Sequence, residues 1–302
     1  MESKDLIIVG AGPAGLTAAI YGLRAGKSVL LIEAKAYGGQ IINTPDIENY
    51  PGLAHVSGFE FAQALYEQVT SFGGELVYGT AAAVGEESGL KTVTTADGTV
   101  YTAKAVILAT GAKNRPIGLE REEELIGRGV SYCATCDGMF FRKKTVAVYG
   151  GGNTALGDAL FLSSICEKVY LIHRRDAFRG SAADLEKLKK CTNVEFVLNS
   201  NVTKLIGEEK LTAVEVTDKL SGKRRELEVA GLFVAIGQIP DNTAFAAVAD
   251  LDKSGYIIAD EDCRTKTPGV YTAGDCRTKT VRQLTTAAAD GAVAALAASE
   301  AM

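Results

Sequence analysis

The sequence predicts an α/β fold made of two Rossmann-like, three-layer domains, with the second domain inserted into the first. Three observations predict this fold. Two segments share the order strand, glycine-rich turn, helix and strand, and they share one spacing along the chain. An apolar strand that ends in Gly-Asp returns near the C-terminus, after the second segment is complete. A length of 302 residues also favours two domains over one.

The first segment opens with the apolar strand 6–9, which ends in Gly10-Ala11-Gly12-Pro13-Ala14-Gly15. A helix from Ala14 to about Ala25 and the strand 29–32 complete a βαβ unit that ends in Glu33. In a dinucleotide-binding turn, Gly10 allows the tight turn, Gly12 lets the backbone approach pyrophosphate, and Gly15 lets the helix pack on the strand. Glu33 lies where an acid accepts hydrogen bonds from an adenosine ribose.

The second segment repeats this plan. The strand 145–149 leads into Gly150-Gly151-Gly152-Asn153-Thr154-Ala155, a helix continues to about Ile165, and the strand 169–172 ends in His173-Arg174-Arg175. Glu33 follows Gly10 by 23 residues, and His173 follows Gly150 by the same 23 residues. The two βαβ units are therefore in register, which a chance motif seldom achieves.

The two units differ at the position that faces the ribose. An acid repels a ribose 2′-phosphate, whereas arginines bind one through charge-assisted hydrogen bonds. The first unit therefore suits a dinucleotide with free ribose hydroxyls, such as FAD or NAD, and the second suits NADP through Arg174, Arg175 and Arg179. The competing interpretation is a solvated surface patch of arginines, and the position of the adenosine ribose disfavours it.

Further repeated elements indicate how the domains are divided. Each βαβ unit is followed by a β-rich stretch with a turn signal and then by a strand that ends in glycine, at Gly111 and at Gly237. The strand 269–275 and the small-residue helix 285–299 are too short for a third domain. We therefore expect residues 1–113 and 243–302 to form one discontinuous domain, with residues 114–242 inserted.

Composition excludes several classes of protein. The net charge of −5 shows no basic excess of the kind that nucleic-acid binding requires. No apolar run is long enough to span a membrane, and the N-terminus leads into a strand rather than a signal sequence. Six cysteines without such a signal favour a reducing compartment, so we expect a cytoplasmic protein.

The pair Cys133 and Cys136 lies shortly before the second glycine-rich turn. Two thiols at this spacing can close and reopen a disulfide, although half of a zinc site has the same spacing. A zinc site needs two more ligands, and the sequence holds neither a second such pair nor a suitable histidine pair, so we expect no metal. A dithiol also needs a proton donor or acceptor, and Asp137 is adjacent to Cys136.

These motifs together resemble the low-molecular-weight thioredoxin reductases. Beyond those quoted above, the matching motifs include Gly38-Gly39-Gln40, Glu48-Asn49-Tyr50-Pro51-Gly52, Ala109-Thr110-Gly111-Ala112, Ala273-Gly274-Asp275 and Arg282-Gln283. They span nearly the whole chain in the family's order. Tyr132 departs from the family, where a smaller residue is common, and Gly157-Asp158 replaces a frequent Glu-Glu pair.

The resemblance implies FAD in the discontinuous domain and NADPH in the inserted domain. The residues implied for FAD are Gly10, Gly12, Pro13, Ala14, Gly15, Glu33, Gly39, Gln40, Asn49, Thr110, Gly111, Ala112, Gly274, Asp275, Arg282 and Gln283. The residues implied for NADPH are Gly150, Gly152, Asn153, Thr154, His173, Arg174, Arg175, Arg179, Ile236 and Gly237.

The resemblance also implies a mechanism. Electrons pass from NADPH through FAD to the Cys133–Cys136 disulfide and then to oxidised thioredoxin, with Cys136 facing the flavin and Cys133 attacking the partner. Asp137 exchanges the proton. The cysteine pair and the NADPH turn lie on one inserted domain, so rotation of that domain between the two half-reactions is expected.

The resemblance further implies a homodimer that packs through its FAD domains, and docking of thioredoxin near Arg128, Met139, Phe140 and Phe141. For the two phenylalanines, a place in the core is an equally good interpretation. The alternative function is a flavoprotein of the same architecture that reduces another protein disulfide, on a glutaredoxin-like protein or a peroxidase.

Overall fold

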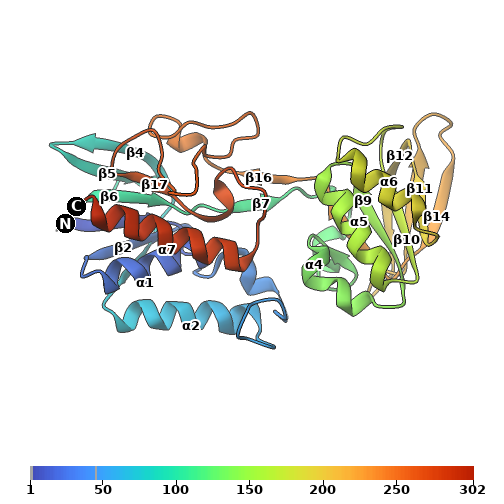
Figure 1. Ribbon diagram of the computed structural model, residues 1–302, viewed down its shortest axis with the longest axis horizontal. Helices are drawn as coiled ribbons and strands as arrows, with labels where there is room; N and C mark the ends of the chain where they lie inside the picture. The colour runs from blue at the N-terminus through green and yellow to red at the C-terminus, as the bar shows by residue number, and fades with distance from the viewer. Residues whose placement is uncertain (1–2, 45) are drawn as a thin grey trace. The chain divides into compact units, whose positions relative to one another are not determined.

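The chain folds into two compact units. The computed structural model describes residues 3–44 and 46–302. Unit 1 comprises Met1–Lys113 and Ile239–Met302, and unit 2 comprises Asn114–Gln238 (Figure 1). Each unit has a sheet with parallel strands; in unit 1 antiparallel strands extend that same sheet, and in unit 2 they form a separate sheet. The predicted α/β class of two Rossmann-like domains, one inserted into the other, is confirmed.

Unit 1 is built on one mixed sheet. Its strands are β1 (Lys4–Val9), β2 (Val29–Glu33), β3 (Glu75–Tyr78), β4 (Ala81–Glu87), β5 (Leu90–Thr95), β6 (Val100–Leu108) and β17 (Val270–Thr272). The order β3-β2-β1-β6 is parallel, and β6, β5 and β4 continue as an antiparallel meander. Burial on both faces explains why β1 and β2 are apolar runs rather than alternating patterns.

One edge of β6 has two partners. Its first half, from Val100 to Ala103, pairs antiparallel with β5, and its last half, from Val106 to Leu108, pairs parallel with β17. The C-terminal part of the chain thereby completes a sheet that the N-terminal part began.

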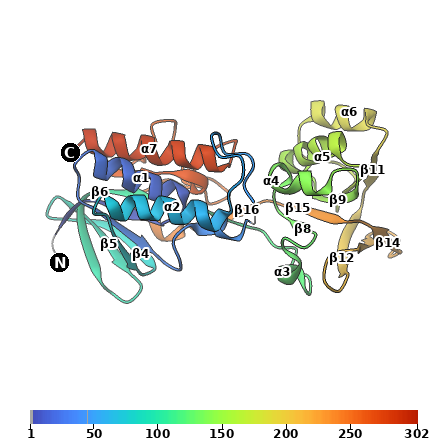
Figure 2. The ribbon, with the colours of Figure 1, turned by 90° about the horizontal axis from the view of Figure 1, so that it is seen from below.

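Three helices cover one face of this sheet: α1 (Pro13–Arg24), α2 (Gly58–Ser71) and α7 (Leu284–Glu300), as Figure 2 shows. The 3-10 turns are η1 (Gly39–Asn43), η3 (Thr243–Phe245) and η4 (Gly274–Cys276). Ser57 and Glu60 form a reciprocal capping box at the start of α2. The helices α1 and α7 approach closely, because a Cβ atom at Gly291 would overlap the carbonyl oxygen of Ala14.

Unit 2 has a fully parallel sheet in the order β11-β10-β9-β15-β8. These strands are β8 (Val130–Ser131), β9 (Thr145–Gly150), β10 (Lys168–Ile172), β11 (Val194–Val197) and β15 (Gly231–Ala235). An antiparallel sheet holds β12 (Ser200–Ile206), β13 (Ala213–Asp218) and β14 (Arg224–Glu228). The helical segments are α3 (Glu122–Leu125), α4 (Ala134–Asp137), η2 (Gly138–Phe141), α5 (Asn153–Ile165) and α6 (Ala182–Lys190).

Two hydrophobic cores form the layers of unit 2. One core joins the parallel sheet to α4, α5 and α6, and it includes Ala134, Leu156 and Leu188. The other joins the sheet to the antiparallel strands, and it includes Val214 and Leu232.

The two connections between the units pair with each other. The strands β7 (Ala112–Asn114) and β16 (Gln238–Pro240) form a two-stranded ribbon. Beside it, Arg115 N donates to Gly237 O at 3.0 Å, and Gln238 Nε2 donates to Asn114 Oδ1 at 3.2 Å. The units divide after Gln238, whereas the sequence placed that boundary at 242/243, because the buried Asn242 amide bonds to carbonyls within unit 1.

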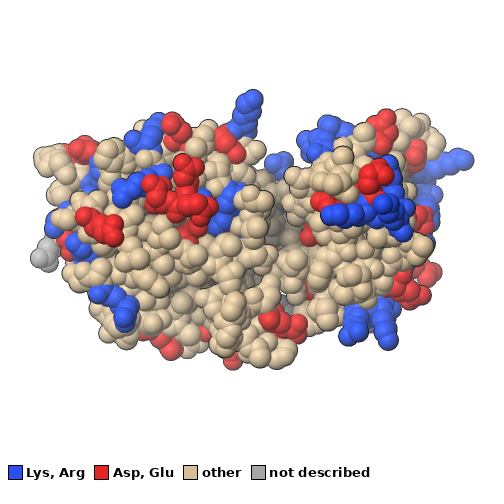
Figure 3. Space-filling model, viewed as in Figure 1, with Lys and Arg blue, Asp and Glu red and all other residues tan. Residues whose placement is uncertain are grey.

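The surface carries both signs of charge. Figure 3 shows lysines and arginines among aspartates and glutamates on the face that it presents. Over residues 3–44 and 46–302, no helix is both long enough and apolar enough to cross a lipid bilayer.

Candidate active site

The carboxyl ends of four parallel strands of unit 1 lie along one edge of the sheet. The strands β2, β1, β6 and β17 are neighbours, and each ends at a predicted site segment. Gly10 follows β1, Glu33 ends β2, Ala109–Ala112 follows β6, and Ala273–Asp275 follows β17. Ligands of open α/β sheets bind at this edge, where the strand order reverses.

The first glycine-rich turn meets the requirements of a backbone cradle. Gly10 has φ +104°, and a Cβ atom there would overlap the carbonyl of Ala109. A Cβ atom at Gly15 would overlap the carbonyl of Gly10, whereas the nearest atom to one at Gly12 is the Cα of Gly39, at 4.0 Å. Helix α1 begins with Pro13 and has no side-chain cap, so its first N–H groups suit an anion such as pyrophosphate.

Glu33 is attached to this turn. Its Oε2 accepts from Ala11 N at 2.7 Å, and its Oε1 accepts from Lys35 N at 2.9 Å. The carboxylate therefore lies beside the glycine-rich turn, at the end of β2, where an adenosine ribose would bind.

The other predicted residues of unit 1 form hydrogen-bonded pairs beside the same edge. Gln40 Nε2 donates to Ala112 O, and Asn49 Nδ2 donates to Gln283 Oε1 at 3.3 Å. Thr110 Oγ1 donates to Asn242 Oδ1 at 2.7 Å. Asn242, which is 1 % exposed, was not predicted from the sequence.

Asp275 has the clearest unmet bonding capacity. Its Oδ1 is buried and has no hydrogen-bond partner among the described residues. Burial raises the pKa of Asp275, and the charges of Lys279 and Arg282 oppose that rise. Arg282 stacks on Tyr256, with 4.1 Å to the ring centroid, and donates to the carbonyls of Asp275 and Arg277. A buried acceptor without a donor suits a ligand hydroxyl.

A buried charge cluster fixes the turn that carries Asp275. Asp290 of α7 accepts from Gly274 N at 2.9 Å, from Arg277 Nε and Nη2 at 2.8 Å each, and from Lys279 Nζ at 2.8 Å. Burial opposes ionisation of Asp290, but Arg277 and Lys279 outweigh it and hold the pKa of Asp290 below its usual value. The sequence signal for this cluster is a lone acid in the small-residue helix.

In unit 2, the second glycine-rich turn is equally restricted. A Cβ atom at Gly150 would overlap the carbonyl of Ala235, whereas Gly152 has open space around it. Asn153 Oδ1 accepts from Ser181 N at 2.8 Å, and Thr154 is exposed beside it at the start of α5. Gly237, with φ +106°, and the partly buried Ile236 follow the neighbouring strand β15.

His173, which the sequence predicts to bind NADPH, lies buried in unit 2 with its ring packed against the glycine-rich turn. The residue is 4 % exposed, its Nε2 lies 3.2 Å from Ala177 O, and its ring stacks on Phe178. A Cβ atom at Gly151 would overlap this ring. Burial lowers the pKa of His173, which favours the neutral imidazole beside the turn.

The arginines form the exposed rim of this turn. Arg174, Arg175 and Arg179 are all exposed, and Arg179 N donates to Gly151 O at 2.8 Å. None of the three forms an ion pair with a carboxylate in the part of the chain that the structure describes. Their guanidinium groups are therefore available to an anionic ligand.

Cys133 and Cys136 form a disulfide at the start of α4, with their Cα atoms 5.3 Å apart. Both cysteines are partly exposed. Cys133 N donates to Ser131 Oγ at 3.1 Å, and Cys133 Sγ lies 3.5 Å from Thr135 Oγ1. The other four cysteines, Cys166, Cys191, Cys263 and Cys276, are free thiols.

Asp137 directly follows the disulfide and is largely removed from water. Burial raises the pKa of Asp137, and a 2.6 Å hydrogen bond from Ser131 Oγ opposes that rise. Ser131 was not predicted from the sequence, where an isolated serine carries no signal.

The predicted docking residues divide into two groups. Arg128, Met139 and Phe140 are exposed, the last two by 46 % and 45 %. Phe141 instead packs against Phe233, with ring centroids 5.3 Å apart, and its ring fills the space beside Gly231. Phe141 is therefore partly buried against the core of unit 2, which agrees with the alternative interpretation that the sequence left open for it.

Comparison with known proteins places these features in a family context. The family model for pyridine nucleotide-disulphide oxidoreductases matches residues 4–291. A thioredoxin reductase of Treponema pallidum is 44 % identical over 295 residues, which is 97 % of this chain and 95 % of that protein.

Solved structures agree with this match. A thioredoxin reductase from Streptococcus pyogenes has a TM-score of 0.92 and 39 % identity, covering 99 % of this chain and 98 % of that one. The thioredoxin reductase from Giardia duodenalis has a TM-score of 0.93 and 33 % identity, covering 100 % and 99 %.

Proposed function

This chain belongs to the pyridine nucleotide-disulphide oxidoreductase family, and we propose that it is a thioredoxin reductase that carries electrons from NADPH to oxidised thioredoxin. One observation carries the proposal most directly. The Cys133–Cys136 disulfide and its neighbouring acid lie in the same unit as an arginine-rimmed dinucleotide turn. That combination joins a two-electron thiol couple to a source of hydride.

The residues of each unit fit the cofactor proposed for it. In unit 1, the glycine cradle suits pyrophosphate, Glu33 suits ribose hydroxyls, and the buried Oδ1 of Asp275 suits a hydroxyl of the FAD ribityl chain. In unit 2, the exposed Arg174, Arg175 and Arg179 suit the 2′-phosphate of NADPH. When bound, FAD accepts hydride from NADPH and delivers an electron pair to a disulfide.

The chemistry of the chain itself is thiol–disulfide exchange. Two electrons open the Cys133–Cys136 disulfide, and Asp137 supplies the proton that Cys136 then holds. Cys133, as thiolate, attacks the disulfide of thioredoxin and forms a mixed disulfide, which releases one partner thiolate. Cys136 returns its proton to Asp137 and attacks Cys133, which reforms the disulfide and releases reduced thioredoxin.

We propose that unit 2 rotates between these half-reactions, because its disulfide and its nucleotide turn must both serve one flavin. The ribbon of β7 and β16 is the connection about which rotation would occur, and Gly111 and Gly237, both with positive φ, flank it. A covalent cross-link between the units should preserve flavin reduction or disulfide reduction but not both. Normal turnover in the cross-linked protein would contradict rotation.

Thioredoxin is proposed to dock where Arg128, Met139 and Phe140 are exposed near the disulfide. Exposed aromatic and arginine side chains are the residue types that dominate protein interfaces. We place the reaction in the cytoplasm, where thiol pools are kept reduced.

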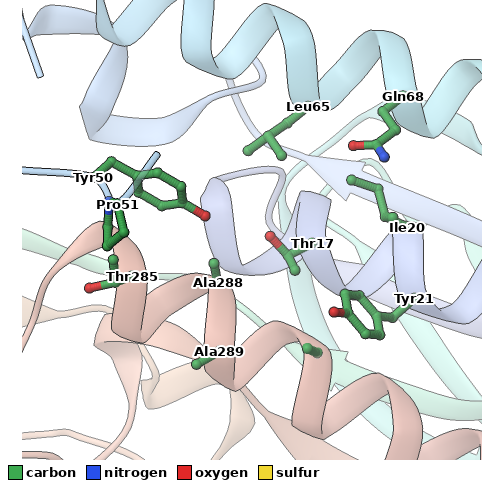
Figure 4. Close-up of a pocket in the computed structure, with 11 residues that line it drawn as sticks. Thr17, Ile20, Tyr21, Tyr50, Pro51, Leu65, Gln68, Thr285, Ala288 and Ala289 are labelled. Atoms are coloured by element: carbon green, nitrogen blue, oxygen red, sulfur yellow. The ribbon is translucent and has the colours of Figure 1, made fainter. Parts of the chain in front are cut away.

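A homodimer through unit 1 is also proposed. An apolar groove of about 400 Å³ runs between α1, α2 and α7, and its lining includes Ile20, Tyr50, Leu65 and Ala288 (Figure 4). The exposed Leu296 of α7 extends the apolar surface along that helix. Analytical ultracentrifugation should give twice the chain mass, and Ala288→Arg should give monomers.

Anaerobic reduction followed by coupled turnover tests the proposed activity. NADPH should bleach the flavin absorbance, and NADPH consumption should then depend on added oxidised thioredoxin. Parallel assays with a glutaredoxin-like protein and a disulfide-form peroxidase test the competing substrates. Faster turnover with either of these than with thioredoxin would contradict the assignment of substrate.

A further inference from the structure

The hydroxyl of Ser131 connects the two ends of the redox-active turn. Ser131 is the last residue of β8 and is 4 % exposed. Its Oγ lies 2.6 Å from Asp137 Oδ2, accepts from Cys133 N at 3.1 Å, and lies 3.3 Å from Cys133 O. A hydroxyl has one proton, and the shortest contact is to the carboxylate, so that proton is donated to Asp137.

Ser131 contacts one oxygen of the Asp137 carboxyl, and the other oxygen has no hydrogen-bond partner within residues 3–44 and 46–302. Among the described residues, only Ser131 donates to this carboxyl, through Oδ2. Oδ1 is therefore the oxygen that can exchange a proton with a neighbouring thiol.

The elements packed against α4 carry one further acid. Helix α4 packs against η2 and α5. The four residues of η2 carry no titratable side chain, whereas α5 carries Asp158, and burial raises the pKa of Asp158 to about 7. The hydroxyl of Tyr132 donates a hydrogen bond to Glu122 Oε1 at 2.5 Å. Burial raises the pKa of Asp137, and the hydrogen bond from Ser131 is the contribution that lowers it.

We propose that Ser131 is a positioning residue for the dithiol steps, which fixes the Asp137 carboxyl to the Cys133 backbone and leaves Oδ1 to exchange the proton with Cys136. This proposal rests on the proposed function. When an electron pair breaks the S–S bond, two thiolates form; neutral Asp137 gives its proton to Cys136, and Ser131 stabilises the resulting carboxylate. In the second half-reaction the proton returns from Cys136 to Asp137, and the Cys136 thiolate then attacks the mixed disulfide.

Ser131→Ala removes the hydroxyl that stabilises the ionised carboxyl. The titration midpoint of Asp137 should rise by about one to two pH units, because a hydrogen bond to a charged group has that strength. NMR of carboxyl-labelled aspartate measures this midpoint directly, with Asp137→Asn to assign the signal. Ser131→Thr, which keeps the hydroxyl, should return the midpoint to that of the wild type.

The pH profile of single-turnover thioredoxin reduction provides the second measurement. In Ser131→Ala, the part of this profile that depends on the titration of Asp137 should shift to higher pH. The rate of flavin reduction by NADPH should not change. In an Asp137→Asn background, Ser131→Ala should have no further effect on the profile. Ser131→Gly provides the same loss of hydroxyl if the alanine variant does not fold.

An unchanged Asp137 midpoint in a folded Ser131→Ala or Ser131→Gly variant would overturn the role of Ser131. A wild-type protein that does not reduce thioredoxin would instead overturn the proposed substrate. The NMR midpoint does not depend on the partner, so the two failures are distinguishable.

Discussion

Replacing Asp290 with alanine should destabilise unit 1 by about 3–5 kcal/mol, the usual cost of removing one partner from a buried ion pair. Asp290 accepts four hydrogen bonds, and the side chains of Arg277 and Lys279 are only 5 % and 8 % exposed. Without the carboxylate, two buried cations face each other with no anion between them. Summing four charged hydrogen bonds at ~1.5–3 kcal/mol each would overestimate the loss, since Arg277 keeps carbonyl partners at Ala259 and Thr278.

Urea unfolding followed by circular dichroism measures this loss. The matched control is Asp262→Ala, which removes an exposed aspartate that pairs with Arg264 at 3.4 Å. An exposed pair contributes ~0–1 kcal/mol, so the control should stay near the wild type. Equal losses in the two variants would refute the argument that burial makes the Asp290 cluster important.

The effect of pH follows from the lowered pKa of Asp290. A carboxyl whose pKa is lower in the folded state stabilises the protein above its unfolded pKa of ~3.9, and this contribution is lost as the pH falls through the folded value. The difference in free energy of unfolding between the wild type and Asp290→Ala should therefore be largest near neutral pH and should shrink in strong acid. A difference that grows toward low pH would contradict an ionised Asp290.

Three other predictions concern the reaction. Cys133→Ser should abolish thioredoxin reduction while NADPH still reduces the flavin, because Cys133 is the cysteine proposed to attack the thioredoxin disulfide. The control is Cys191→Ser, at a free thiol. Residual thioredoxin reduction in Cys133→Ser would contradict this role of Cys133. Replacing both Arg174 and Arg175 by alanine should raise the KM for NADPH about 10- to 100-fold and change the KM for NADH little. The reason is that each arginine offers charge-assisted hydrogen bonds to the 2′-phosphate, which NADH lacks. Equal changes in the two KM values would refute the binding of the 2′-phosphate by these arginines. Phe140→Ser should raise the KM for thioredoxin roughly tenfold, as the loss of an aromatic interface residue does. The control Leu220→Ser, at a residue of the same unit that is 81 % exposed, should leave this KM unchanged. An unchanged KM in Phe140→Ser would exclude Phe140 from the docking surface.

The parts of the fold that sequence could predict are those set by local backbone demands. Gly10 is required by a positive φ and by the carbonyl of Ala109, so its spacing from Gly15 identifies the turn before any tertiary structure is known. The return of the C-terminal strand to unit 1 was also predictable, because Val270–Thr272 repeats the apolar strand and glycine of β6.

The side-chain partnerships could not be predicted in the same way. Asp290 meets Arg277 because α7 turns back over η4, and His173 is buried because it fills the space that Gly151 leaves. Phe141 points inward while its neighbour Phe140 is exposed, a difference that depends on a single turn of 3-10 helix. Such orientations follow from packing, which residue spacing does not encode.

The hydrogen bonds between Asn114–Arg115 and Gly237–Gln238 bear on how the chain assembles. They hold the first and last residues of unit 2 next to each other. For unit 1, the folded insert therefore connects two chain positions that lie close together, as a short hairpin turn would. The closure entropy of a loop grows only with the logarithm of its length, and a prefolded insert with joined ends removes most of even that cost. Unit 2 can therefore fold before β6 and β17, which lie on either side of it in the sequence, pair in the sheet of unit 1. The same geometry makes the insert exchangeable: another domain with adjacent ends could replace it without disturbing the sheet of unit 1.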